Sequence, residues 1–469
     1  MFGLDAPAAA SSEPEADDRA AAALDRLDRV ASDPAAMQAL ADRKVRVELS
    51  AAGGQRTVVL DPRTADPAAG PLESGRVFTV TIDPDLIDPF LRGTLREVAV
   101  LTAGRFRVRG DLDPVVTTFD IWRELSLAYL TLDGAPPPEG PTRFDVLGYA
   151  VHGAAKRPDL LAVRGPLDGT PASQAVLATL IFVNLPPICR GIEVVGAFED
   201  AGTAGVTTLL ATMTAFLQGV GELPAAAGPE VPPTSDSDDA AGRQRLLELL
   251  AASELPGPVE LQIVAGKGAR YLLLDPVAHS VEPMRPTRSP TARIRLRAAA
   301  TAPTFARGAA GLPLALLRGD LQVMGGVEFA WAALAALDRA ASAWRDDGAP
   351  PSLPAEAPAT LTSPGRGLPP ELTDAAVDQM LLAAAVAAAL PVAEAAALTA
   401  ALEREYADGH IARRRLVRYM VSLADLVAGN SDHMNDRADL QLNAWLGAER
   451  DAELTEAYVA RGPGYHARR

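Results

Sequence analysis

Apolar and polar residues alternate along residues 45–62, with a glycine-containing turn in the middle of the stretch. A two-residue period on both sides of a turn predicts a β-hairpin with one buried face. Residues 259–276 repeat this pattern and align with residues 45–62 without a gap, 214 positions later. Aligned pairs include Val47 with Leu261, Gly54 with Gly268, Leu60 with Leu274, and Asp61 with Asp275. The chain therefore contains two related hairpins.

Two further blocks match in the same order along the chain. At an offset of 215, Phe90, Arg92 and Gly93 align with Phe305, Arg307 and Gly308, and residues 104–110 (GRFRVRG) align with residues 319–325 (GDLQVMG). The sequence DGAPP of residues 133–137 recurs at residues 347–351, again at an offset of 214. Three blocks in order at nearly constant spacing indicate a tandem duplication.

Each copy has the same predicted order of elements. Apolar residues at helical spacing, such as Leu24, Leu27 and Val30, predict a helix before the hairpin. The predicted elements after it are a strand (77–82; 293–297), a helical segment (90–101; 305–317), a short strand (105–109; 321–324) and a closing helix through Trp122 or Trp331. This order is typical of an α+β unit with a mostly antiparallel sheet.

The stretch after each copy is predicted to be mainly helical. Apolar residues three and four apart in residues 206–220 predict an amphipathic helix, whereas residues 173–184 fit either a helix or a strand. After the second copy, helices are predicted at residues 372–390, 393–406, 411–428 and 438–460. The sequence leaves open whether these two stretches share an ancestor.

The domain prediction follows from these elements and from the composition between them. Proline-rich and acidic stretches are typical of linkers. The predicted parts are an acidic disordered tail (1–20), module 1 (21–135), a helical or mixed segment (142–224), a linker (225–241), module 2 (242–349), a second linker (350–370) and a C-terminal helical bundle (371–469).

The order of elements in each copy, with its G-x-x-x-V-x-G strand at residues 104–110 and 319–325, resembles the sterol carrier protein 2-like domain. The resemblance implies a curved sheet covered by helices, with an apolar tunnel that accepts a fatty acyl chain, a sterol or another lipid. Two departures from the pattern are Gly326 where copy 1 has Asp111, and proline-rich segments between strands in both copies.

An apolar cavity is the physical requirement for such a ligand, because a lipid tail makes no directional polar contacts. Aromatic and leucine residues of the predicted helices are the candidates for its lining, although the same residues also fill ordinary cores. The candidates are Phe90, Leu95, Leu101, Phe119 and Trp122 in copy 1, and Phe305, Leu312, Leu316, Phe329 and Trp331 in copy 2.

Composition narrows the class of partner. The 469 residues carry 44 Lys and Arg against 60 Asp and Glu, and a net charge of −16 repels a phosphate backbone, so no nucleic acid is expected. One cysteine in the chain and an acidic N-terminus without an apolar stretch favour a cytoplasmic protein. The longest apolar run, residues 380–393, is shorter than the roughly 20 residues that span a bilayer. An excess of alanine, proline and arginine fits a GC-rich bacterial coding sequence.

Three groups of residues raise the question of chemistry. Cys189 is either a nucleophile or, as we expect, a small buried residue. Asp432, His433 and Asp436 have the spacing of metal ligands or of a helix-capping loop, and we expect the loop. The arginines at positions 413, 414, 415 and 418 offer a surface to anionic lipid or form ion pairs with Glu403 and Glu405. No metal and no cofactor are expected.

The function expected from the sequence is the binding, sequestration or transfer of an apolar molecule without catalysis. One alternative is a cyclase-like biosynthetic enzyme that uses the same cavity. The other is a structural or assembly protein whose module interiors are filled by side chains. The helical segments leave open a protein partner or a homo-oligomer, and peripheral contact with a membrane.

Overall fold

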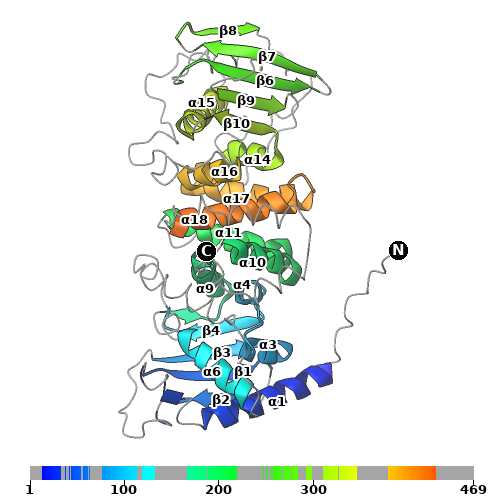
Figure 1. Ribbon diagram of the computed structural model, residues 1–469, viewed down its shortest axis with the longest axis vertical. Coiled ribbons are helices and arrows are strands. Elements are labelled where there is room, and N and C mark those ends of the chain that lie inside the picture. The colour runs from blue at the N-terminus through cyan, green and yellow to red at the C-terminus, as the bar shows by residue number, and fades with distance from the viewer. Residues whose placement is uncertain are drawn as a thin grey trace, which may run out of the picture. The chain divides into compact units, whose positions relative to one another are not determined.

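The computed structural model forms two units, which are described separately because their relative positions are not determined (Figure 1). The division falls between Leu209 and Leu210, inside helix α11 (Gly202–Gln218). The structure describes residues 13–32, 37–38, 42, 44–53, 56–61, 63, 76–112, 119–132, 166–185, 187–218, 247, 250, 255, 257–265, 268–275, 277–283, 292–297, 310–325, 327–345 and 379–428.

Unit 1 is built on a five-stranded mixed sheet of order β2-β1-β3-β4-β5. Its strands are β1 (Arg46–Ala51), β2 (Thr57–Leu60), β3 (Val77–Ile82), β4 (Phe106–Gly110) and β5 (Leu167–Asp168). β1 pairs parallel with β3, and the other neighbours pair antiparallel. Alternate residues such as Val47, Phe78 and Val108 are buried, so one face of the sheet carries the core.

The helices of unit 1 fall into two groups. α1 (Glu13–Ala31), α3 (Ile87–Leu91) and α6 (Phe119–Thr131) contact one another, and α1 also contacts β2. α4 (Glu97–Thr102) lies between β4 on one side and α9 (Pro171–Asn184) and α10 (Pro187–Asp200) on the other (Figure 1). We call α9 and α10 the cover of unit 1.

Unit 2 contains a five-stranded mixed sheet of order β10-β9-β6-β7-β8. Its strands are β6 (Val259–Ala265), β7 (Gly268–Asp275), β8 (Ser280–Pro283), β9 (Ala292–Arg297) and β10 (Leu321–Gly325). α14 (Gly311–Arg318) contacts β10 and α15 (Val327–Arg345), and also α16 (Gln379–Ala389), α17 (Val392–Ala407) and α18 (Arg413–Ala428) (Figure 1). We call α16, α17 and α18 the cover of unit 2.

The strand topology agrees with the predicted duplication. The order β2-β1-β3-β4 in unit 1 has the same pairing directions as β7-β6-β9-β10 in unit 2, including one parallel pair. The hairpin registers differ by two residues, because Val47 faces Leu60 whereas the aligned Leu261 faces Leu272. A shift of two preserves the alternation, so both hairpins keep the same face buried.

The repeated glycine motif has a structural cause in both units. Gly104 and Gly319 have φ of 72° and 77° and follow α4 and α14, where the next residue's N–H reaches back five residues, from Arg105 to Val100 and from Asp320 to Ala315. This is a Schellman ending, which favours glycine. The second glycine, Gly110 or Gly325, has φ of 137° or 144° and ends the strand.

Each cover is joined to its unit by the same pair of hydrogen bonds. Gln174 of α9 accepts the N–H of Val108 at 2.8 Å and donates to its carbonyl at 2.9 Å. Gln379 of α16 accepts the N–H of Val323 at 2.9 Å and donates to its carbonyl at 2.7 Å. Because the two valines align in the glycine motif, the repeat extends into the cover helices, which the sequence left open.

The α+β class and most of the predicted elements are confirmed, with several differences in detail. Each sheet is mostly antiparallel as predicted, with one parallel pair, and residues 173–184, which the sequence left open, lie in a helix. The segment 90–101 is split into α3 and α4 around Gly93 (φ 68°). β5 and β8 were not predicted. The predicted linkers 225–241 and 350–370 and the helix 438–460 lie outside the described residues.

Helix α1 begins at Glu13, inside the segment 1–20 that was predicted to be a disordered tail. Most of the acidic residues taken as a sign of a solvated tail belong to the first turns of this helix, positions that favour acidic residue types. Pro14 also fits the first turn, where its missing N–H costs no helical hydrogen bond.

Candidate functional site

Three aromatic side chains meet in the interior of unit 1. Phe90 of α3, Phe106 of β4 and Trp122 of α6 are all buried. The ring centroids of Phe90 and Phe106 are 5.2 Å apart, and those of Phe90 and Trp122 are 4.8 Å apart in an edge-on arrangement. Both separations are typical of direct aromatic contact. We call these residues the aromatic cluster.

Local sequence explains how these side chains reach one place. In α6, Trp122, Leu125 and Tyr129 are spaced three and four residues apart and form one buried stripe. In β4, alternation directs Phe106 and Val108 inward while Arg107 and Arg109 are exposed. The sheet and two helices from distant parts of the chain therefore each contribute one ring.

α3 and α6, which carry two rings of the aromatic cluster, also take part in a polar network together with α1. The hydroxyl of Tyr129 donates to Asp88 at 2.8 Å, and Arg92 donates to the other oxygen of Asp88 at 2.7 Å. Arg26 of α1 donates to the carbonyl of Tyr129 at 2.7 Å, and its guanidinium lies 4.9 Å from the centre of the Tyr129 ring. We call Arg26, Asp88, Arg92 and Tyr129 the polar rim.

Burial and hydrogen bonding define the roles of Tyr129 and Asp88 in the polar rim. Burial, and then the hydrogen bond to Asp88, raise the pKa of Tyr129 above its ordinary value. The phenol therefore keeps its proton at neutral pH and acts as a donor. Asp88 accepts from two partners at once, so its carboxylate is held in place between a phenol and a guanidinium.

The predicted lining residues of copy 1 lie in the interior of unit 1. Phe90, Leu95, Leu101 and Trp122 are buried, and the structure brings Phe90 and Trp122 into contact. Leu101 is on α4, the helix that also faces the cover. Phe119 lies in α6, but its side chain is not among those described.

The predicted residues of copy 2 are also interior where the structure describes them. Leu312 and Leu316 of α14 and Trp331 of α15 are buried. Phe329 lies in α15 without a described side chain, and Phe305 lies outside the described residues. Leu321 occupies the position that aligns with Phe106, so this ring of the aromatic cluster is absent from unit 2.

Sequence reasoning missed Phe106 and the whole polar rim. The alternation of residues 105–109 would have placed Phe106 inward. Tyr129 lies seven residues after Trp122, which is two turns along the same helical face. The contact between Tyr129 and Asp88 joins positions 41 residues apart, so no local sequence pattern predicts it.

The other candidate groups found in the sequence have separate outcomes. Cys189 is a buried residue of α10, as expected. Arg415 donates to the carbonyl of Leu317 at 3.0 Å, while Glu405 accepts from Arg318 at 3.2 Å. Asp432, His433 and Asp436 lie outside the described residues, and within the described ones no three potential ligands gather into a metal site.

No family model, curated protein or solved structure matches this chain. The resemblance to the sterol carrier protein 2-like domain therefore stays a prediction. Among the helices that the structure describes, none is both long and apolar enough to cross a bilayer.

Proposed function

We propose that this is a non-catalytic binding protein and that module 1 takes up an apolar molecule between α3, α6 and the sheet. The observation that carries the proposal is that α3 and α6 each contribute to both the aromatic cluster and the polar rim. A fatty acyl chain, sterol or terpenoid with one polar end requires this combination of an apolar interior and a few polar groups at one side.

The driving force would be the removal of apolar surface from water, worth about 25 cal/mol per Å² buried. The rings of Phe90, Phe106 and Trp122 contact one another, so a guest must separate α6 from α3 to enter. Tyr129 of α6 donates to Asp88 of α3, so opening also breaks or bends this hydrogen bond. A polar end group that accepts from Tyr129 would compensate for this loss.

The test is to extract the purified full-length protein with organic solvent and to identify bound molecules by mass spectrometry. Binding of a fluorescent fatty acid, cis-parinaric acid, then gives an affinity. We expect Trp122→Ala to weaken binding at least tenfold, whereas the matched variant Trp331→Ala in unit 2 leaves the module 1 site intact. Circular dichroism establishes that both variants are folded. An extract free of apolar molecules, together with no binding of the probe, would rule out the proposal.

A structural or assembly role is the second candidate, favoured by the packing itself. Contacting rings fill the interior of unit 1, and residues 97–101 of α4 and 311–317 of α14 are buried throughout. For this role, Trp122→Ala would lower the thermal stability of unit 1 while the purified protein carries no guest in any variant. Chemical conversion of an extracted molecule during incubation would instead indicate the enzymatic alternative.

A further inference from the structure

The two covers align without a gap from Gln174 to Asp200 and from Gln379 to Glu405, 205 positions apart. Leu185 and Pro186 match Leu390 and Pro391 within this block. Both covers hold the aligned strand residue, Val108 or Val323, by the same two glutamine hydrogen bonds. These shared bonds do not distinguish one module from the other.

Three charged residues distinguish the cover interface of unit 1. Glu97 of α4 and Arg190 and Glu193 of α10 are each fully buried, and α4 packs against α10. Glu193 accepts the backbone N–H of Ala99 in α4 at 3.3 Å, and Arg190 donates to the carbonyl of Val183 in α9 at 2.8 Å. The charges therefore lie where the module helix, α9 and α10 meet.

The aligned positions of unit 2 are apolar. Glu97 aligns with Leu312 through the glycine motif, and Arg190 and Glu193 align with Ala395 and Leu398 through the cover. All three unit 2 residues are also buried. At these three aligned positions, unit 1 thus buries charged side chains where unit 2 buries aliphatic ones.

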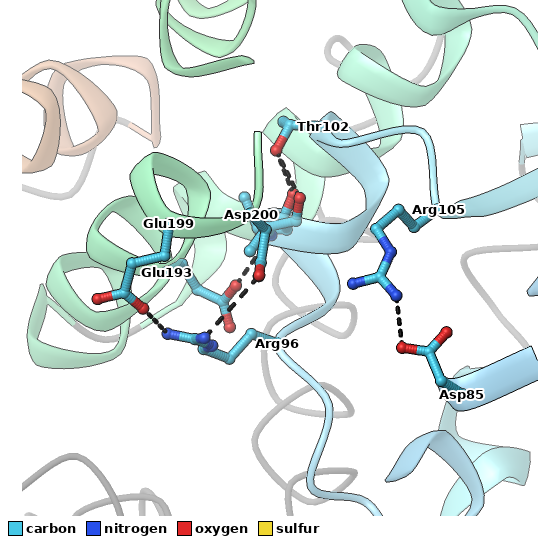
Figure 2. Close-up of polar contacts among 9 residues, drawn as sticks. Asp85, Arg96, Thr102, Arg105, Glu193, Glu199 and Asp200 are labelled. Carbon is cyan, nitrogen blue, oxygen red and sulfur yellow. Dashed lines mark hydrogen bonds and ion pairs between the residues drawn. The ribbon is translucent and has the colours of Figure 1, made fainter. Parts of the chain in front are cut away.

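The ion pairs at the border of each interface differ as well. Asp200 and Glu405 are aligned acids at the ends of their covers, but the arginines that reach them come from opposite ends of the module helix. Arg96 precedes α4 and lies 3.0 Å from Glu199 and 3.8 Å from Asp200 (Figure 2). Arg318 ends α14 and lies 3.2 Å from Glu405.

We propose that Glu97, Arg190 and Glu193 are a pairing code that commits the α9–α10 cover to module 1 and excludes it from module 2. Seating this cover on α14 would bury Arg190 and Glu193 against Leu312, without the carboxylate of Glu97. Seating α16 and α17 on α4 instead would bury Glu97 against Ala395 and Leu398. A charge buried against aliphatic side chains is strongly destabilising, so both wrong pairings are penalised although the glutamine bonds allow them.

The test grafts the sequence of residues 379–405 onto positions 174–200 of the full chain, with and without Glu97→Leu. In the native chain we expect Glu97→Leu to lower the thermal midpoint of unit 1. In the grafted chain the same substitution should raise the midpoint, because it recreates the leucine that the grafted cover meets in unit 2. Glu124→Leu, a half-exposed glutamate of α6, is the control and should have the same small effect in both chains.

A second set of variants keeps the test decisive if the graft fails to fold. The native chain is given the residues of unit 2 singly and together, as Glu97→Leu, Arg190→Ala and Glu193→Leu. We expect the triple variant to melt above each of the single variants, because it removes the buried charges as a group. Two results would overturn the pairing code. One is a shift of the thermal midpoint in the same direction for Glu97→Leu in the native and grafted chains. The other is a triple variant whose midpoint falls by as much as the three single variants combined.

Discussion

The two halves of this protein keep the same backbone devices and differ in the side chains between them. Both have the Schellman glycine after the module helix and the glutamine that bonds the strand beyond it. Unit 1 then adds the aromatic cluster, where Leu321 replaces one ring in unit 2, and buries charges where unit 2 has Leu312 and Leu398. The two units therefore share backbone geometry and differ in the side chains of their interfaces.

The sheet edges show the same divergence. In the described part of the chain, unit 1 extends its sheet beyond β4 by pairing β5, whereas unit 2 extends it beyond β7 by pairing β8. The strand held by the cover glutamine is consequently flanked by another strand in unit 1 and lies at the edge in unit 2. The equivalent glutamines, Gln174 and Gln379, therefore bond strands in two different surroundings, and their substitution tests whether the sheet edge matters.

The largest expected effect comes from removing the glutamine bonds with a side chain of similar shape. Gln174→Met keeps the packing of α9 but leaves the N–H and carbonyl of the buried Val108 unbonded, at about 1–3 kcal/mol for each group. Gln379→Met should cost less, because Gln379 is only part-buried and its strand lies at a sheet edge that water can reach. Calorimetry of both full-length variants measures the difference.

Equal losses in the two halves would show that the sheet edge makes no difference to this bond. A loss only in the Gln379 variant would contradict the comparison. Val59→Met, an exposed position of β2, is the control for introducing a methionine and should shift stability by less than about 0.5 kcal/mol.

How much of this was predictable depends on the range of each interaction. The helix, strand and glycine positions follow from local spacing, and Gly104 with Gly319 marks the same helix ending twice. The two-residue register shift of the hairpins is hidden by an alignment without gaps, because a shift of two conserves the alternation of apolar residues. The likeness of the covers was hidden because few of their aligned residues are identical, and the shared bonds of Gln174 and Gln379 reveal it.

The candidate site shows the same limit. Apolar spacing indicates that Phe90 and Trp122 are interior, but not that they face each other, because α3 and α6 are separate elements whose packing is set by the whole unit. The buried charges were harder still to foresee. Glu97, Arg190 and Glu193 are typical surface residue types, and only their packing between α4 and α10 shows that they belong to an interface.

A smaller effect is expected at the helix endings that the two halves share. The Cβ of an alanine at Gly104 would meet open space, so Gly104→Ala destabilises the protein only by the left-handed backbone strain, about 1–2 kcal/mol. An alanine at Gly319 introduces the same strain and also places its Cβ against the guanidinium of Arg415, which donates to the carbonyl of Leu317. Gly319→Ala should therefore lose about 1 kcal/mol more than Gly104→Ala in thermal denaturation, which is the worth of the disturbed hydrogen bond.

Removing Arg415 tests this assignment directly. In an Arg415→Ala background the side chain that obstructs the new Cβ is gone, so Gly319→Ala should cost about as much as Gly104→Ala does in the native chain. If the extra loss persists without Arg415, the obstruction is not its source.

The smallest effect is expected at Asp168, in β5, which belongs to unit 1 alone in the comparison of sheets. The hydroxyl and then the backbone N–H of Thr170, with a further contribution from Ser173, lower the pKa of Asp168 to about 2. A carboxylate whose pKa is lower in the folded than in the unfolded state stabilises the fold above its unfolded value, and this stabilisation is lost as pH falls through the folded value. Stability of the native chain should therefore decline between about pH 4 and pH 2 partly through this group, and Asp168→Asn should remove that part. Because Asp168 is exposed, we expect Asp168→Asn to flatten only modestly the fall of the thermal midpoint at acid pH. The exposed Asp111→Asn variant is the control. An Asp168→Asn curve that runs parallel to the native one over this range would show that the Thr170 hydrogen bonds, which also orient the N-cap of α9, contribute no charge-dependent stability to the cover.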